Sequence, residues 1–142
     1  MSLSVLVVDD SAVMRSMVIK TLRLSGVPVK DIYQAANGQE ALAVVDKHWI
    51  DLALVDLNMP VMSGEEFIDR LKLNPATDSL PIIVVSPEGS QTRIDSLRAK
   101  GAAFVHKPFA PEKLRQVILE LTGVECGEQF NDGTISSSGP DF

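Results

Sequence analysis

The sequence predicts an α/β fold, in which a parallel five-stranded sheet carries helices on both faces. Three observations support this prediction. Short apolar, β-branched segments recur along the chain, longer segments with helical periodicity separate them, and glycine, proline, serine or asparagine marks many of the boundaries. Parallel neighbours require crossover connections, so the intervening helices are expected above and below the sheet.

Five segments are expected to form the strands, because aliphatic and β-branched residues dominate them. They are Ser4–Val8, Asp31–Ala35, Leu52–Asp56, Ile82–Ser86 and Ala103–His106. A helical segment follows each of them. Connections of this kind are nearly always right-handed, which favours a doubly wound arrangement of five strand–helix units.

Five helices are expected between and after these strands. Apolar residues mark one face of the first helix (Met14, Met17, Val18 and Leu22) and one face of the third (Phe67, Ile68 and Leu71). The other three helices are placed at Gly38–Lys47, Gln91–Lys100 and Pro111–Leu121.

Residues suited to helix ends support these boundaries. Asn37 and Ser63 fit N-cap positions, where a side-chain oxygen accepts a backbone N–H. Gly26 and Gly101 fit the left-handed position that follows a helix. Pro111 fits the first helical turn, where its missing N–H costs little.

The length of 142 residues, 45% of them hydrophobic, allows one full core but not two ordinary domains. We expect one domain over residues 1–122. From Gly123 onward the periodic pattern stops and turn-forming polar residues prevail, so residues 123–142 are expected to form a flexible tail. No DNA-binding or catalytic domain is expected after Leu121.

Charge and composition exclude several function classes. The net charge of −6 and the pI of about 4.8 argue against direct nucleic-acid binding. Cys126 is the only cysteine, which excludes an internal disulfide and fits a reducing compartment. No segment approaches the roughly 20 apolar residues that span a bilayer. We therefore expect a cytoplasmic protein that is not inserted in a membrane.

The ends of the predicted strands carry the candidate site. In open α/β sheets, ligands bind beyond the carboxyl ends of the strands. Asp9 and Asp10 follow the first strand, Asp56 ends the third, Ser86 ends the fourth, and Lys107 follows the fifth. Three converging carboxylates repel one another unless a cation joins them, and oxygen ligands favour Mg²⁺, with Mn²⁺ as a possible substitute.

This set of residues suits phosphoryl transfer. Asp56 can act as a carboxylate nucleophile and form an aspartyl phosphate. The metal and Lys107 would neutralise the phosphoryl oxygens, and Ser86 would donate a hydrogen bond to one of them.

Separate motifs along the chain, each quoted as it stands, resemble one family. They are Val5-Leu6-Val7-Val8-Asp9-Asp10, Val55-Asp56-Leu57-Asn58-Met59-Pro60 with Gly64, Val85-Ser86, and Lys107-Pro108-Phe109. Together they resemble the response regulator receiver family, especially its stand-alone chemotaxis-type (CheY-like) members, from about Ser4 to Leu121. The resemblance implies a flavodoxin-like (βα)₅ three-layer sandwich with strand order 2-1-3-4-5.

The resemblance also implies a function for the site. A sensor histidine kinase would supply the phosphoryl group to Asp56, in two-component signal transduction. Asp9, Asp10, Asp56 and the backbone carbonyl of Asn58 would bind Mg²⁺. Asn58 and Glu88 match positions that tune the lifetime of the phosphate, so an intrinsic autophosphatase activity is expected.

Further residues match the family's switch. Ser86 and Phe104 correspond to the hydroxyl and the aromatic residue that change position on phosphorylation, and Lys107 to the lysine that pairs with the phosphate. The Lys107–Pro108 bond is a candidate cis peptide. The face formed by residues Gln91–Leu121 is the expected contact surface for a downstream protein.

Three other functions compete with this interpretation. A phosphatase of the haloacid-dehalogenase type would need a second Asp two residues after Asp56, where this chain has Asn58. A nucleotide or flavin binder would need a glycine-rich phosphate loop, which is missing. A phosphorylation-independent interaction module is disfavoured by the intact set of Asp10, Asp56, Ser86 and Lys107.

Overall fold

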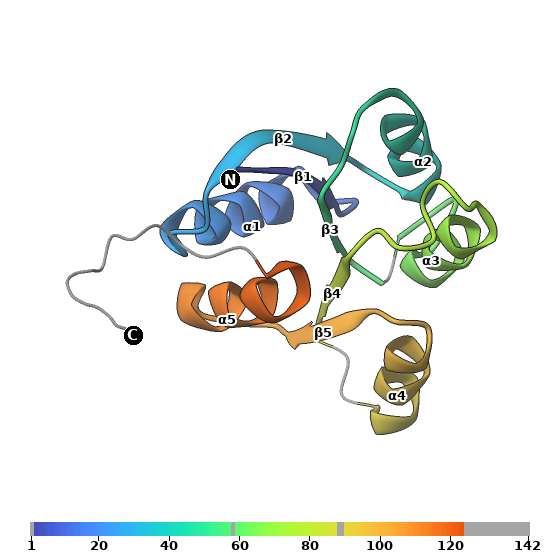
Figure 1. Ribbon diagram of the computed structural model, residues 1–142. Coiled ribbons are helices and arrows are strands. Elements are labelled where there is room, and N and C mark those ends of the chain that lie inside the picture. Colours follow the sequence, from blue (N-terminus) through green and yellow to red (C-terminus); the bar gives the residue numbers. More distant parts are fainter. Residues whose placement is uncertain (1, 58, 88–89, 124–142) are drawn as a thin grey trace.

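The computed structural model describes residues 2–57, 59–87 and 90–123, in which strands and helices alternate throughout (Figure 1). In chain order the elements are β1 (Leu3–Val8), α1 (Ala12–Leu24), β2 (Val29–Ala35), α2 (Gly38–Lys47), β3 (Leu52–Val55), α3 (Gly64–Leu73), β4 (Ile82–Ser86), α4 (Gln91–Ala99), β5 (Ala103–His106) and α5 (Pro111–Thr122).

The five strands form one parallel sheet in the order β2-β1-β3-β4-β5. Helices α1 and α5 cover one face, and α2, α3 and α4 cover the other (Figure 1). The predicted three-layer (βα)₅ sandwich and its strand order are therefore confirmed.

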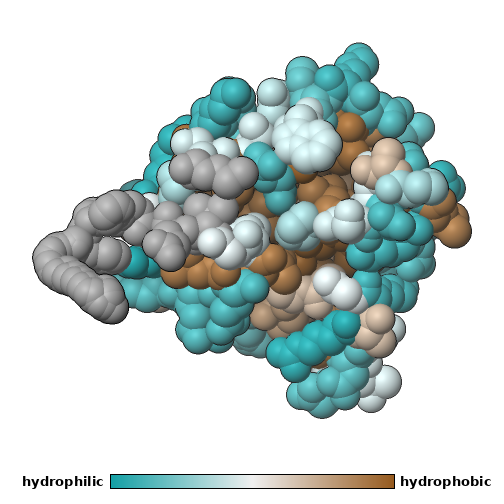
Figure 2. Space-filling model, in the orientation of Figure 1, coloured by the Kyte–Doolittle hydropathy of each residue, from teal (hydrophilic) through white to brown (hydrophobic). Residues whose placement is uncertain are grey.

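Two hydrophobic cores lie on opposite faces of the sheet. Alternate residues of a strand point to opposite faces, so Val5 and Val7 pack with α1 and α5, whereas Leu6 and Val8 pack with α2, α3 and α4. All six residues of β1 are buried, as expected for a central strand covered on both sides. In the surface view, the outer sides of the helices are mostly hydrophilic and apolar side chains gather between the two helix layers (Figure 2).

The predicted boundaries agree with the structure to within two residues. The largest shift is in β2, which begins at Val29 rather than at Asp31. Strand β3 ends at Val55, so Asp56 is the first residue beyond it. Helix α4 ends at Ala99 and Lys100 is its C-cap.

The predicted inner face of α1 is wrong at one residue. Val18 and Leu22 are buried and Met14 is half-buried, whereas the Met17 side chain is 57% exposed. Met14, Val18 and Leu22 follow one another at a spacing of four and form one stripe along the helix. Met17 lies about 100° around the helix axis from Val18, which takes it out of that stripe.

The predicted helix ends are confirmed. Asn37 accepts the backbone N–H of Glu40, and Ser63 and Glu66 form a reciprocal capping box at the start of α3. Gly26 and Gly101 have φ angles of 83° and 88°, the left-handed conformation that glycine adopts without strain. Pro111 is the first residue of α5.

The end of α5 is the last part of the chain that the structure describes. Gly123 closes this helix with a left-handed φ of 73°. The predicted tail falls, from residue 124 onward, outside the described residues, so the domain boundary at 122 stays a prediction. Among the described helices, none combines the length and apolarity that a membrane crossing requires.

Candidate functional site

The central strands bring three carboxylates together at the carboxyl edge of the sheet. Strand β1 runs into Asp9 and its neighbour β3 runs into Asp56, and the Asp56 N–H donates to the Val8 carbonyl oxygen at 2.9 Å. Asp10 follows Asp9 directly. One carboxylate oxygen from each of Asp9, Asp10 and Asp56 lies within 4.8 Å of the other two. The predicted acidic cluster is therefore present in the fold.

The three aspartates differ in their surroundings. Asp9 is 4% exposed, Asp56 is half-buried and Asp10 is exposed. The Asp9 Oδ1 atom accepts the backbone N–H of Ser11 at 3.0 Å, which fixes this carboxylate at the start of α1. Asp10 faces solvent and is the most accessible of the three.

Arg15 is a site neighbour that sequence reasoning missed. Its Nη1 atom donates to the backbone carbonyl of Asp9 at 2.6 Å, and its Nε atom donates to the Gln34 side chain at 3.0 Å. Arg15 thus ties α1 and β2 to the turn that carries the aspartates. A single arginine one turn into a helix gave no signal in the sequence, because its partner is a backbone atom.

Lys107 supplies the cation that faces the cluster. Its Nζ atom lies 3.4 Å from Asp9 Oδ2 and 3.7 Å from Asp56 Oδ1, and the side chain is 15% exposed. These distances exceed those of a tight charged hydrogen bond, so the ammonium stands between two carboxylates without closing on either. The Lys107–Pro108 bond, the candidate cis peptide in the sequence, is cis in the structure.

The pKa of Asp56 is raised above its ordinary value of 3.8. Burial is the main cause, since it penalises the charged form. The Lys107 ammonium acts in the opposite direction, Asp9 raises the pKa further, the Leu57 N–H lowers it, and Asp10 adds a small increase. An ionised Asp56 is therefore not fully compensated by the protein groups around it.

Ser86 lies at the same edge of the sheet. It is the last residue of β4, the strand beside β3, and it is fully buried. The backbone N–H of Lys107 donates to the Ser86 carbonyl oxygen at 2.9 Å. The ends of β4 and β5 are thus joined directly next to the carboxylate cluster.

Phe104 stands further from the edge than the other predicted residues. It is half-buried in β5 opposite Val84, two residues before the strand ends, and it packs against the core on the α2, α3 and α4 side. Its ring centroid lies 6.5 Å from that of His106, at an interplanar angle of 60°. Asn58 and Glu88, the two residues predicted to tune the phosphate lifetime, lie outside the described residues.

Gly64 sets the distance between α3 and the phosphoacceptor candidate. A Cβ atom at this position would lie 2.4 Å from the Asp56 carbonyl oxygen, and the Gly64 N–H donates to the Leu57 carbonyl oxygen at 3.1 Å. Only glycine allows such a close approach. Helix α3 therefore starts directly against the backbone of Asp56.

A cleft of about 330 Å³ lies at the opposite edge of the sheet, and its lining includes Leu3, Trp49, Ile50 and Leu121. Trp49 is 80% exposed and its Nε1 donates to Asp51 at 2.8 Å. The polar groups expected for phosphoryl transfer lie at the other end of the strands. This cleft is thus separate from the carboxylate cluster.

Comparison with known proteins assigns the family. The sequence model for the response regulator receiver domain matches residues 5–119. The chain is a response regulator receiver domain. It is 32% identical over 128 residues to a chemotaxis protein CheY homolog of Campylobacter jejuni, with 89% of this chain and 97% of the relative covered. It is also 31% identical to chemotaxis protein CheY1 of Helicobacter pylori, with 85% and 98% covered.

Solved structures agree with the sequence relatives. The chemotaxis response regulator CheY4 of Vibrio cholerae superposes with a TM-score of 0.74 at 35% identity, covering 85% of this chain and 99% of that one. The likeness spans nearly the whole of that chain. The receiver domain described here is thus a CheY-like signalling switch of two-component systems, and its acidic cluster occupies the carboxyl edge of the same fold.

Proposed function

We propose that this receiver domain takes a phosphoryl group onto Asp56 from the phosphohistidine of a sensor histidine kinase. One observation carries the proposal: oxygens of Asp9, Asp10 and Asp56 lie within 4.8 Å of one another, with the Lys107 ammonium 3.4 and 3.7 Å from two of these carboxylates. An acidic cluster beside one fixed cation suits the binding of a divalent metal and a phosphoryl group together.

The residues at the site fit Mg²⁺, or Mn²⁺ in its place. The ligands offered are hard oxygen atoms from three carboxylates, to which we add the backbone carbonyl of Asn58. The pKa of Asp56 is raised mainly because the carboxyl group is partly buried, so a bound cation would stabilise its ionised form. When bound, the metal would neutralise charge on the phosphoryl oxygens.

The protein residues divide the transfer among them. An Asp56 carboxylate oxygen attacks the phosphorus atom, a P–O bond forms, and the P–N bond to the donor imidazole breaks as that nitrogen takes up its electron pair. Lys107 exchanges its contact with Asp56 for one with a phosphoryl oxygen. The Ser86 hydroxyl donates a hydrogen bond to another. The imidazole leaves as a neutral ring when the other ring nitrogen of the phosphohistidine already carries a proton, so no residue of this chain needs to act as a general acid.

The same site would return the phosphoryl group to water. We propose an intrinsic autodephosphorylation in which Asn58 and Glu88 flank the path of the attacking water and tune its rate. The similarity to chemotaxis proteins of this family supports a role in chemotaxis-type signalling within the cytoplasm.

We assign the output to the face formed by residues 91–121, which comprises α4, β5 and most of α5. Ser86 and Lys107 are joined at the edge of this face, so movement of Ser86 toward a phosphoryl group can be passed to Phe104 and α4. Apart from Lys107, which faces the carboxylate cluster, this segment holds five Lys or Arg and three Asp or Glu residues, a net charge of +2 in a chain of −6. A downstream protein with an acidic contact surface is the partner that fits.

Intact mass spectrometry tests the proposal. The protein is incubated with acetyl phosphate and Mg²⁺, beside Asp56→Asn and the matched surface variant Asp46→Asn on α2. We expect one phosphoryl group on the wild type and on Asp46→Asn, stable to acid and labile to alkali, and none on Asp56→Asn. A wild type without this mass gain, or an Asp56→Asn variant that still gains it, would contradict the proposal.

A further inference from the structure

Helix α4 has the least apolar anchoring of the described helices. Leu97 is its one buried residue, whereas α3 buries Gly64, Phe67, Ile68 and Leu71. Burial of a single leucine gives a helix of nine residues few contacts that fix its position along the sheet. Polar contacts must therefore contribute a larger share of what holds α4 in place.

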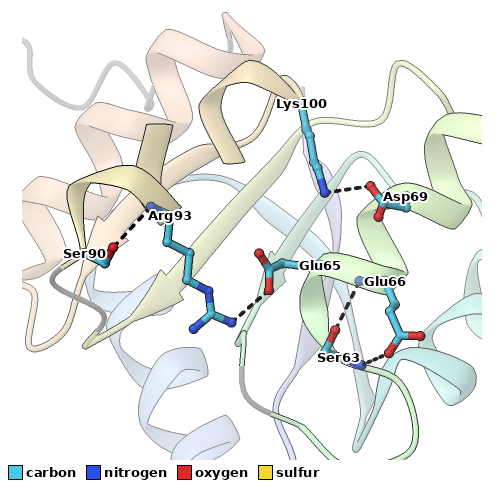
Figure 3. Close-up of polar contacts among 7 residues, drawn as sticks. All are labelled: Ser63, Glu65, Glu66, Asp69, Ser90, Arg93 and Lys100. Atoms are coloured by element: carbon cyan, nitrogen blue, oxygen red, sulfur yellow. Dashed lines mark hydrogen bonds and ion pairs between the residues drawn. The ribbon is translucent and has the colours of Figure 1, made fainter. Parts of the chain in front are cut away.

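Two ion pairs join α4 to α3 (Figure 3). Arg93 Nη2 lies 2.9 Å from Glu65 Oε1 near the start of α4, and Lys100 Nζ lies 2.9 Å from Asp69 Oδ1 at its C-cap. Glu65 and Asp69 are one turn apart on α3, so both acids project from the same side of that helix. The pairs thus hold α4 at both of its ends.

The first of these pairs also connects the helices that follow Asp56 and Ser86 in the chain. Glu65 is the second residue of α3, whose first residue, Gly64, packs against the Asp56 carbonyl oxygen. Arg93 lies in the first turn of α4, whose N-cap Ser90 is four residues beyond Ser86. A shift of the Ser86 loop relative to Asp56 would therefore move Arg93 relative to Glu65.

We propose that the Glu65–Arg93 and Asp69–Lys100 pairs act as an electrostatic strap that sets the threshold for displacement of α4. Both pairs are formed with α4 in the position described here, so the strap stabilises this position of the helix and opposes its displacement. The inference rests on the proposed function for its regulatory meaning. The hold of the strap on α4 can be measured without any phosphodonor.

Charge reversals at Glu65 and Arg93, made singly and together, test whether the ion pair itself holds α4. The double variant restores a pair with the two charges exchanged. The variants are Glu65→Arg, Arg93→Glu and the double variant. The control is Lys20→Glu, a charge reversal on an exposed residue of α1, which covers the other face of the sheet. The first readout is hydrogen exchange of the α4 backbone amides in the absence of a phosphodonor. The second is the rate of phosphorylation by acetyl phosphate with Mg²⁺. Thermal unfolding checks that each variant is folded.

Each single reversal at Glu65 or Arg93 is expected to speed α4 exchange and phosphorylation by roughly two- to fivefold, the size of effect that one half-exposed pair supports. The double variant should return both rates toward wild type, and Lys20→Glu should leave them within the error of wild type. At ~1 M NaCl, where the Debye length is about 3 Å, the differences should shrink.

The outcomes distinguish this inference from the proposed function. Equal α4 exchange in wild type, single reversals and double variant would overturn the strap, whatever the phosphorylation rates. If the single reversals speed α4 exchange but leave the phosphorylation rate unchanged, the strap does not control phosphorylation. The proposal that Asp56 is the acceptor would be unaffected. A wild type that accepts no phosphoryl group would contradict the proposed function and the coupling together, while the exchange data would still decide whether the pairs hold α4.

Discussion

The centre of the sheet and its β5 edge differ in how deeply their residues are buried. Every residue of β1 and β3 is buried, whereas β5 has two half-buried residues and ends in the exposed His106. The aspartates follow the central strands, and the face that we expect to respond lies over the edge. The fold thus places the carboxylate cluster on closely packed strands and the face that we propose for output on a lightly anchored segment, where displacement costs less free energy.

Truncation of one residue in each region tests this contrast with the largest expected effect. Leu54→Ala in β3, where the side chain is 1% exposed, should lower the free energy of unfolding by about 2–5 kcal/mol. Ile94→Ala in α4, at a half-buried position, should cost only about 1 kcal/mol. Urea denaturation measures both. Equal losses would show that α4 is anchored as firmly as the central sheet.

Removal of the Lys107 ammonium tests the proposed chemistry at the carboxyl ends of the central strands. Lys107→Ala should slow phosphorylation by acetyl phosphate by on the order of 100-fold, the usual loss when one charged group that stabilises a transition state is removed. Lys113→Ala on α5, which removes an exposed lysine, serves as the control. The rate is followed by intact mass against time. A Lys107→Ala protein as fast as Lys113→Ala would remove this residue from the mechanism.

A substitution of Gly64, where α3 begins against the backbone of Asp56, should have a smaller effect on stability and on the phosphorylation rate. The Cβ atom of Gly64→Ala would meet the Asp56 carbonyl oxygen at 2.4 Å, so we expect a loss of about 1–3 kcal/mol in stability and slower phosphorylation. Gly26→Ala, with no atom within 4 Å of its Cβ but a φ of 83°, should cost about 1 kcal/mol and leave the phosphorylation rate unchanged. Denaturation and mass spectrometry measure the two effects. A normal phosphorylation rate in Gly64→Ala would show that α3 does not position Asp56.

The pH dependence of stability offers the finest test. Because burial raises the pKa of Asp56 above 3.8, its protonated form favours folding below about that pH, and this contribution is lost as the pH rises through the raised value. In EDTA, Asp56→Asn should therefore unfold at a higher temperature than wild type near neutral pH, and the gain should vanish below pH 3.8. Added Mg²⁺ should reduce the difference in unfolding temperature between Asp56→Asn and wild type. If wild type unfolded at a higher temperature than Asp56→Asn in EDTA at neutral pH, the Asp56 charge would not be uncompensated, and the account would be contradicted.

The sequence predicted most of the fold because each element is specified locally. The apolar segments at Ser4–Val8 and Ile82–Ser86 and the caps at Asn37 and Ser63 depend on short-range patterns that the structure reproduces. Met17 was misplaced because apolarity alone does not show which side of α1 meets the sheet. The strand ends predicted that Asp9, Asp10 and Asp56 converge, since parallel strands bring their carboxyl ends to one edge.

Contacts between elements were not accessible from the sequence. Arg15 binds the Asp9 carbonyl oxygen, and Arg93 and Lys100 pair with acids on another helix. Each contact depends on the rotation and separation of two elements that are distant in the chain. No spacing in one segment records such a relation, so the sequence analysis singled out none of these contacts.

Chemical mapping of the phosphoacceptor tests the central claim most directly. The protein is phosphorylated with acetyl phosphate and Mg²⁺, reduced with borohydride to convert an acyl phosphate to an alcohol, digested and sequenced by mass spectrometry. The account predicts homoserine at position 56 and at no other aspartate, with none in a sample that received no phosphodonor. Homoserine at Asp9, Asp10 or elsewhere, or no conversion at position 56, would contradict it.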